Sequence, residues 1–165
     1  MKPEPIALLA SLHPCGCVVQ QPKAGNCSIT VPNQSTCCIC CDTCSSFSSS
    51  NNKKPDFILL HFPRASSLIW IVLEMKSRPQ HPRDIALQLQ AGADAIETDP
   101  KFQISAQEGP KPIVGLIPML VHNGKMHESD LQILQTRKVK FGNKKLSILS
   151  KKGGVDISKL PDCHT

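Results

Sequence analysis

Three charged residues border the two most apolar runs of this 165-residue chain. Asp56 follows Pro55 at the start of the run FILLHF, whereas Glu74 closes the run SLIWIVLEM and Lys76 follows two positions later. Side chains alternate along a strand, so Glu74 and Lys76 are expected on one face of a sheet. If the two runs pair as a hairpin, Asp56 at the start of the first run approaches both of them.

Two carboxylates and an ammonium group in one place suit the hydrolysis of a phosphodiester bond. This reaction needs a hard cation that offsets charge on the phosphoryl oxygens and acidifies a water molecule. Magnesium takes oxygen ligands and usually binds one or two carboxylates together with substrate phosphate. A neighbouring lysine can orient the water and stabilise developing negative charge. The alternative is that Asp56 is a turn residue and that Glu74 and Lys76 form a solvated strand end.

The segments Pro55-Asp56 and Glu74-Met75-Lys76, as they stand in KKPDFILL and WIVLEMKS, resemble the motif of the PD-(D/E)xK nuclease superfamily. The resemblance covers residues 55–121 and is carried by a short motif at the ends of two apolar strands. It implies an α/β fold with a restriction-endonuclease-like core, in which helices flank a central mixed sheet. In this chain a Cys-rich insert would precede the catalytic strands.

The resemblance also implies a role for each residue of the site. Asp56, Glu74 and the backbone carbonyl of Met75 would ligate Mg²⁺ or Mn²⁺, and Lys76 would position the attacking water. Several branches of the superfamily place a glutamine on the following helix, and Gln88 matches that position best. The implied activity is that of a metal-dependent endonuclease that hydrolyses DNA phosphodiester bonds.

The remaining composition divides a single expected domain into four zones. These are an N-terminal helix and strands (1–34), a Cys/Ser-rich loop or metal knuckle (35–54), the catalytic core (55–121) and a basic C-terminal segment (122–165). Before the core, apolar periodicity predicts a helix near 4–12 and strands at 17–20 and 28–31. Within the core, a helix begins at Pro82 and fades near 97–100, and a strand through Pro118 lies toward a sheet edge. After the core, we expect a helix at 128–135 and a hairpin at Gly142-Asn143.

The chain has nine cysteines, of which eight lie between residues 15 and 44. Overlapping CxxC spacings could bring thiolates together around one Zn²⁺. The candidate zinc ligands are Cys37, Cys38, Cys40, Cys41 and Cys44. If the protein is secreted, the cysteines could instead form disulfide bonds. An iron–sulfur cluster is disfavoured, because nucleases of this superfamily that carry one usually have several cysteines after the core and only Cys163 lies there. Free thiols in a loop are the remaining alternative.

The net charge of +6 is concentrated toward the C-terminus. Basic residues of this kind either solubilise a surface or neutralise phosphates. The predicted contacts to the DNA backbone, with RNA as the alternative nucleic acid, are Arg78, Arg83, Arg137, Lys138, Lys140, Lys144 and Lys145. The superfamily resemblance also allows a homodimer that cuts both strands.

No apolar run approaches the roughly 20 residues that a membrane span requires, which predicts no membrane partner. The apolar patch Ile6–Leu12 is short and contains Ser11, so it is read as a helix and not as a secretory signal, which favours an intracellular, cytoplasmic protein. The rival to the nuclease is a non-catalytic module on a nuclease-like fold, in which cysteine-bound zinc and the basic segment bind nucleic acid or a protein. Cleavage that requires Mg²⁺ or Mn²⁺ would distinguish the nuclease from this module.

Overall fold

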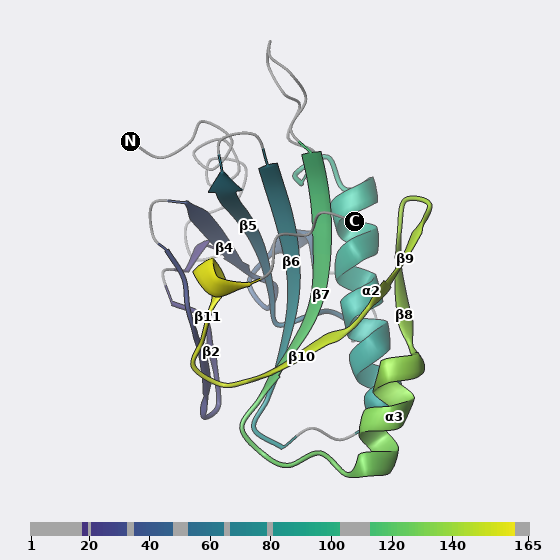
Figure 1. Ribbon diagram of the computed structural model, residues 1–165. Coiled ribbons are helices and arrows are strands. Elements are labelled where there is room, and N and C mark those ends of the chain that lie inside the picture. The colour runs from purple at the N-terminus through teal and green to yellow at the C-terminus, as the bar shows by residue number, and fades with distance from the viewer. Residues whose placement is uncertain are drawn as a thin grey trace.

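The computed structural model describes residues 18–19, 21–32, 35–47, 53–64, 67–78, 81–102 and 113–160. These residues form an α/β fold with mixed sheets and two α-helices (Figure 1). In chain order the elements are β1 (Val18–Val19), β2 (Lys23–Ala24), β3 (Cys27–Thr30), β4 (Thr36–Cys40), η1 (Ser45–Phe47), β5 (Phe57–Arg64), β6 (Ser67–Lys76), α2 (Pro82–Thr98), β7 (Ile113–His122), α3 (Glu128–Thr136), β8 (Lys138–Phe141), β9 (Lys144–Ser147), β10 (Leu149–Lys152), β11 (Val155–Asp156) and η2 (Ile157–Lys159).

The main sheet has six strands in the order β1-β4-β5-β6-β7-β10. Strands β1, β4, β5 and β6 pair antiparallel, whereas β6, β7 and β10 run parallel. Because parallel neighbours need a crossover connection, α2 links β6 to β7 and packs on one face of the sheet (Figure 1). The carboxyl ends of β6 and β7 therefore lie at the same edge as the first turn of α2.

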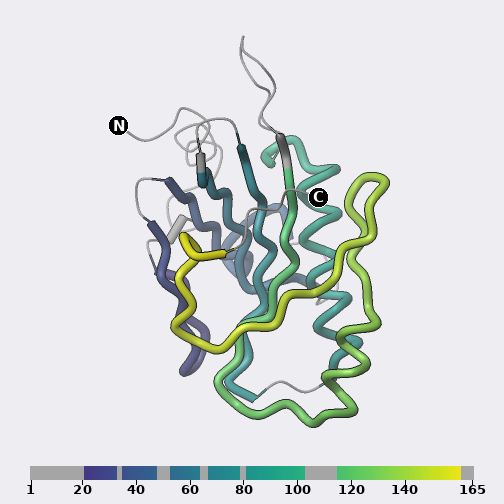
Figure 2. Tube along the Cα trace, viewed as in Figure 1, coloured from purple at the N-terminus to yellow at the C-terminus, as the bar shows by residue number. Residues whose placement is uncertain are grey.

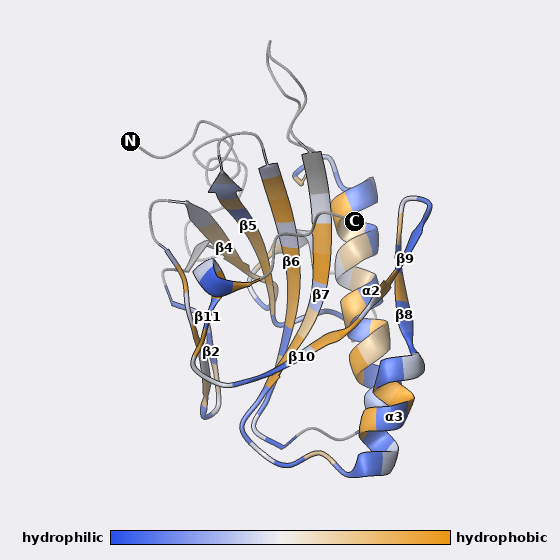
Figure 3. Cartoon of the chain, viewed as in Figure 1, coloured by the Kyte–Doolittle hydropathy of each residue, from blue (hydrophilic) through white to orange (hydrophobic). Residues whose placement is uncertain are grey.

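The predicted hairpin of the two apolar runs is confirmed by the pairing of β5 with β6. Phe57 pairs with Leu73 in this register, which places the residue before β5 beside the end of β6. Strand β6 is buried from Ser67 to Met75 because hydrophobic clusters cover both faces of the sheet. Figure 3 shows the hydrophobic residues concentrated on the central strands and on α2. A strand buried on both faces explains the continuous apolar run.

The predicted helix from Pro82 is confirmed as α2, which lies close against the sheet at Gly92. A Cβ atom at Gly92 would lie 2.4 Å from Cγ1 of Val72 and 2.9 Å from Cγ of Pro55. Only a residue without a side chain allows this approach. Gly92 therefore holds the helix against the strand that carries Glu74 and against the residue that precedes Asp56.

Two expectations were wrong. Residues 36–40 belong to strand β4, not to a loop, and Cys37 and Cys38 are each 3% exposed within it. A buried cysteine behaves as a small hydrophobic residue, so a cysteine-rich run can fill an inner strand. The strand with Pro118 is β7, which lies inside the sheet and not at its edge. Strand β10 pairs with β7 only from Met119 onward, so it covers β7 after the proline.

The second face of the main sheet is covered by a small sheet in the order β11-β3-β2. Residues near the C-terminal end of the described chain return to pair with residues near its start, since Val155 lies opposite Ile29 (Figure 2). The predicted strands at 17–20 and 28–31 correspond to β1 and β3, and the predicted helix at 128–135 to α3. The predicted helix at 4–12 lies outside the described residues.

The predicted turn at Gly142-Asn143 joins β8 and β9 into a hairpin that packs along α2 (Figure 1). Gly142 has a φ of 57°, a left-handed conformation that glycine adopts at little cost. Neither of the helices in the described part of the chain has the length and apolar character needed to cross a membrane.

Candidate metal and phosphodiester site

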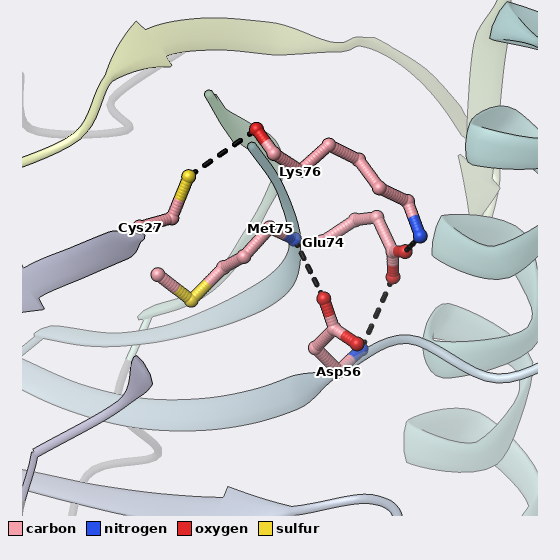
Figure 4. A network of polar contacts seen from close by, with 5 residues as sticks. All are labelled: Cys27, Asp56, Glu74, Met75 and Lys76. Carbon is pink, nitrogen blue, oxygen red and sulfur yellow. Dashed lines mark hydrogen bonds and ion pairs between the residues drawn. The ribbon is translucent and has the colours of Figure 1, made fainter. Parts of the chain in front are cut away.

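Asp56, Glu74 and Lys76 come together where β5 begins and β6 ends (Figure 4). The backbone N–H of Asp56 donates a hydrogen bond to Oε2 of Glu74 at 3.2 Å. In the opposite direction, the backbone N–H of Met75 donates to Oδ2 of Asp56 at 2.8 Å. Each carboxylate is thus held by the main chain of the other strand, and the two acids are fixed relative to each other.

Lys76 completes the group through an ion pair with Glu74. Its Nζ lies 2.5 Å from Oε1 of Glu74. The Glu74 side chain is fully buried, with 0% exposure, whereas the Lys76 side chain is 35% exposed. The ammonium group therefore stands between a buried carboxylate and the solvent.

Burial and mutual repulsion disfavour the charged forms of both acids. The pKa of Glu74 is raised from 4.5 to about 7, mainly by burial and then by the negative charge of Asp56, although contact with Lys76 opposes this rise. Burial also raises the pKa of Asp56 against the lowering effects of the Met75 N–H and of Lys76. Burial lowers the pKa of Lys76, but its hydrogen bond and charge attraction to Glu74 outweigh this effect and raise the pKa overall.

The oxygen atoms of this site are of the chemical type that a hard divalent cation binds. Oε1 of Glu74 is buried, and its contact among the described residues is the Lys76 ammonium group at 2.5 Å. The amide and the carbonyl of one strand residue point toward the same edge, so the Met75 carbonyl is directed toward Asp56 along with its N–H. Two carboxylates and a carbonyl are ligands that Mg²⁺ and Mn²⁺ accept.

A third carboxylate, Asp84, belongs to the surroundings of the site and was missed from the sequence. It lies in the first turn of α2, where it influences the pKa of Lys76 and pairs with Lys53 at 2.8 Å. A charged residue in a helix first turn is usually explained by the helix dipole, so spacing alone did not identify it. His81, which precedes α2, adopts a left-handed φ of 58°, a conformation that is costly for a residue with a side chain.

Gln88, expected to support the site, is half-buried on α2. No hydrogen bond joins Gln88 to the three charged residues, all of which are described. Its neighbour Gln90 instead binds the backbone of Lys140, accepting from its N–H at 2.8 Å and donating to its carbonyl at 3.0 Å. Gln90 therefore anchors the β8–β9 hairpin to α2. The catalytic role of Gln88 stays a prediction.

The candidate zinc cysteines do not converge as one set. Alternation along β4 sends Cys37 to the α2 side of the sheet and Cys38 to the other side. Within the described ranges, no three His, Cys, Asp or Glu side chains are arranged to hold a metal ion. Cys41 and Cys44 share the α2 side with Cys37, and the Cys41 N–H donates to the Asp56 carbonyl at 3.0 Å. These thiols pack beside the strand that follows Asp56, and zinc binding stays a prediction.

The predicted phosphate contacts fall into two groups. Arg78, after β6, and Arg83, in the first turn of α2, are exposed at the same edge of the sheet as the charged site. The remaining five residues lie at the start of the β8–β9 hairpin or within it and are also exposed: Arg137, Lys138, Lys140, Lys144 and Lys145. The two groups flank different parts of α2.

The charged group at the end of β6 is thus the part of the described molecule with the clearest chemical character. It contains a buried glutamate that contacts the Lys76 ammonium group and the backbone N–H of Asp56, and the Asp56 carboxylate in turn accepts from the Met75 N–H. No protein-family model, characterised protein or solved structure matches this chain.

Proposed function

We propose that this protein is a metal-dependent nuclease that hydrolyses DNA phosphodiester bonds at the site formed by Asp56, Glu74 and Lys76. The observation that carries the proposal is the fully buried Glu74 carboxyl group, which contacts both Asp56 and Lys76. A buried acid with a pKa near 7 costs folding free energy, and perturbed groups of this kind cluster at functional sites.

The arrangement of elements supports a restriction-endonuclease-like core. An antiparallel pair, β5 and β6, is followed by α2 and by β7, which runs parallel to β6. Asp56 stands before the first strand of this succession and Glu74 near the end of the second. In open α/β sheets, ligands bind beyond the carboxyl ends of parallel strands, which is where this site lies.

The chain's own residues would divide the work as follows. Asp56 and Glu74, with the Met75 carbonyl, would hold Mg²⁺ or Mn²⁺, which supplies charge neutralisation at the phosphoryl oxygens and lowers the pKa of water. Lys76 would release its ion pair with Glu74, orient the attacking water and stabilise the added negative charge on phosphate. Water would attack phosphorus and lose a proton to solvent, the bond from phosphorus to the leaving oxygen would break, and that oxygen would take up a proton from solvent.

The surroundings favour an anionic substrate. Arg78 in the connection after β6 and Arg83 in the first turn of α2 are both exposed, and arginine binds phosphate through two parallel hydrogen bonds. Asp84 in the first turn of α2 acts electrostatically on Lys76, and a helix N-terminus also attracts negative charge. These groups would position the phosphate backbone while the acids hold the cation.

Cleavage of plasmid DNA in Mg²⁺ or Mn²⁺, compared with EDTA, tests this function. We expect metal-dependent nicking by the wild-type protein and a loss of roughly 100-fold or more in Glu74→Ala and Lys76→Ala. Glu128→Gln and Lys159→Met are matched controls because they remove exposed charges from α3 and η2. Retention of wild-type cleavage in Glu74→Ala, with folding verified by circular dichroism, would overturn the proposal.

A further inference from the structure

One face of the β8–β9 hairpin carries Lys138, Lys140 and Lys145, and the other carries apolar residues together with Lys144, which lies opposite Phe141. Lys140 pairs with Lys145 across the two strands, and Lys138 lies two residues before Lys140 on the same strand. Because side chains alternate, these three lysines share the outer face. The inner face carries Val139, which is fully buried, and Leu146, which packs against the cluster beneath α2. The burial of this inner face therefore directs the lysines to solvent.

The pairing of Lys140 with Lys145 is unfavourable for the isolated protein. Like charges directly opposite each other in an antiparallel pair destabilise it by a few tenths to about 1 kcal/mol. Among the described residues, no carboxylate forms an ion pair with Lys138, Lys140 or Lys145. Lys138 donates instead to the hydroxyl of Ser147, its cross-strand neighbour, at 2.5 Å. The positive charge of this face is thus left for an external anion.

The lysine face is rigidly attached to α2. The side-chain amide of Gln90 binds both backbone groups of Lys140, as a neighbouring strand would do. At the tip of the hairpin, the N–H of Gly142 donates to the carboxylate of Glu97 near the end of α2. Charges that are held in a fixed position lose little conformational freedom when they bind a partner.

The helix also sets the distance between this face and the acidic site. Asp84 lies in the first turn of α2, at the edge of the sheet where β6 ends. At a rise of 1.5 Å per residue, Gln90 lies roughly 9 Å and Glu97 roughly 20 Å along the helix from Asp84. The lysines of the hairpin therefore lie about 9 to 20 Å along α2 from the acidic site. This distance corresponds to about three to six base pairs of a duplex with a rise of 3.4 Å per base pair.

We propose that Lys138, Lys140 and Lys145 bind the backbone of a double-stranded nucleic acid that extends along α2 from the acidic site. The proposal rests on the proposed function for the position of the bond that is cut. A duplex suits this surface because it carries about one charge per 1.7 Å and is stiff over this distance, so that one rod can reach both fixed points. The contacts are to phosphate and give affinity without sequence preference.

Binding of a fluorescent duplex of about 30 base pairs, measured by anisotropy in EDTA over a range of salt concentrations, tests the proposal. The test variant is Lys140→Gln/Lys145→Gln. The matched control is Lys23→Gln/Lys159→Gln, which removes the same charge from exposed positions in β2 and η2. Loss of two phosphate contacts should weaken binding by roughly 30- to 60-fold near 0.1 M salt and reduce the salt slope by about 2.

Each outcome decides the matter. Weaker duplex binding and a smaller salt slope in the test variant alone would support the lysine face. Equal losses in both variants would show only a general charge effect and would overturn it, as would unchanged binding in the test variant. Binding of a fluorescent single strand of the same length that equals or exceeds binding of the duplex would overturn the duplex assignment. The binding test in EDTA does not depend on cleavage. If the lysine variant lowers duplex binding but the wild-type protein does not cut DNA in Mg²⁺ or Mn²⁺, the lysine face is supported and only the nuclease function is refuted.

Discussion

Replacement of Glu74 by glutamine tests whether the buried carboxyl group carries the electrostatic cost described above. The pKa of Glu74 is raised to about 7 from an ordinary value of 4.5, and its side chain has 0% exposure. The folded protein therefore binds this proton more tightly than the unfolded chain does. Its contribution to stability is complete below the unfolded pKa and is lost as the pH rises through the folded one.

The expected loss follows from these two values. Between about pH 5 and about pH 8 without divalent cations, ionisation of Glu74 should lower the free energy of unfolding of the wild-type protein by about 2–3 kcal/mol. Glu74→Gln cannot ionise and should lack this component. Burial also raises the pKa of Asp56, so this acid adds a loss of the same sign. The difference between the two proteins therefore isolates Glu74.

Urea denaturation in EDTA, followed by circular dichroism across this pH range, provides the free energies. Glu128→Gln is the control, because it replaces an exposed glutamate and should retain the wild-type pH dependence. The reasoning fails if Glu74→Gln loses as much stability as the wild-type protein between the two pH values. Added Mn²⁺ should stabilise the wild-type protein at the higher pH and leave Glu74→Gln nearly unchanged.

Three further predictions concern the surroundings of the site. Gly92→Ala should lower the free energy of unfolding by about 1–3 kcal/mol, because the Cβ of the alanine would overlap Val72 of the sheet. A gain in stability, measured by urea denaturation, would contradict this packing. Lys76→Met leaves the Glu74 carboxylate unpaired and should cost about 2 kcal/mol near pH 8 but much less near pH 5, when the two urea curves are compared. Gln90→Ala should cost about 1 kcal/mol and speed hydrogen exchange at the Lys140 amide, whereas unchanged protection would refute the anchoring role.

The hairpin that forms the site was predictable because its signals are local and strong. Two continuous apolar runs define β5 and β6, and strand alternation then places Glu74 and Lys76 on the same side. Pro82 and the apolar periodicity after it define α2 in the same way. The contact among the three charged residues follows from this short-range pairing.

Other parts of the fold depend on partners that are distant in the sequence. The run Thr36–Cys40 has the burial of an inner strand, but its cysteines suggest metal ligands as readily as core residues. The position of β7 inside the sheet depends on β10, whose sequence LSKK has no apolar pattern. The proximity of Asp84 to Lys76 likewise requires the packing of α2 against the sheet, which no spacing rule supplies.

The central claim is that Asp56 and Glu74 share a divalent cation, and a crystal structure of the protein soaked with Mn²⁺ tests it most directly. We expect an anomalous peak about 2.1 Å from a carboxylate oxygen of each acid, with the Lys76 ammonium displaced from Oε1 of Glu74. Saturating Mn²⁺ that leaves the 2.5 Å ion pair intact, with no peak between the two acids, would contradict the claim.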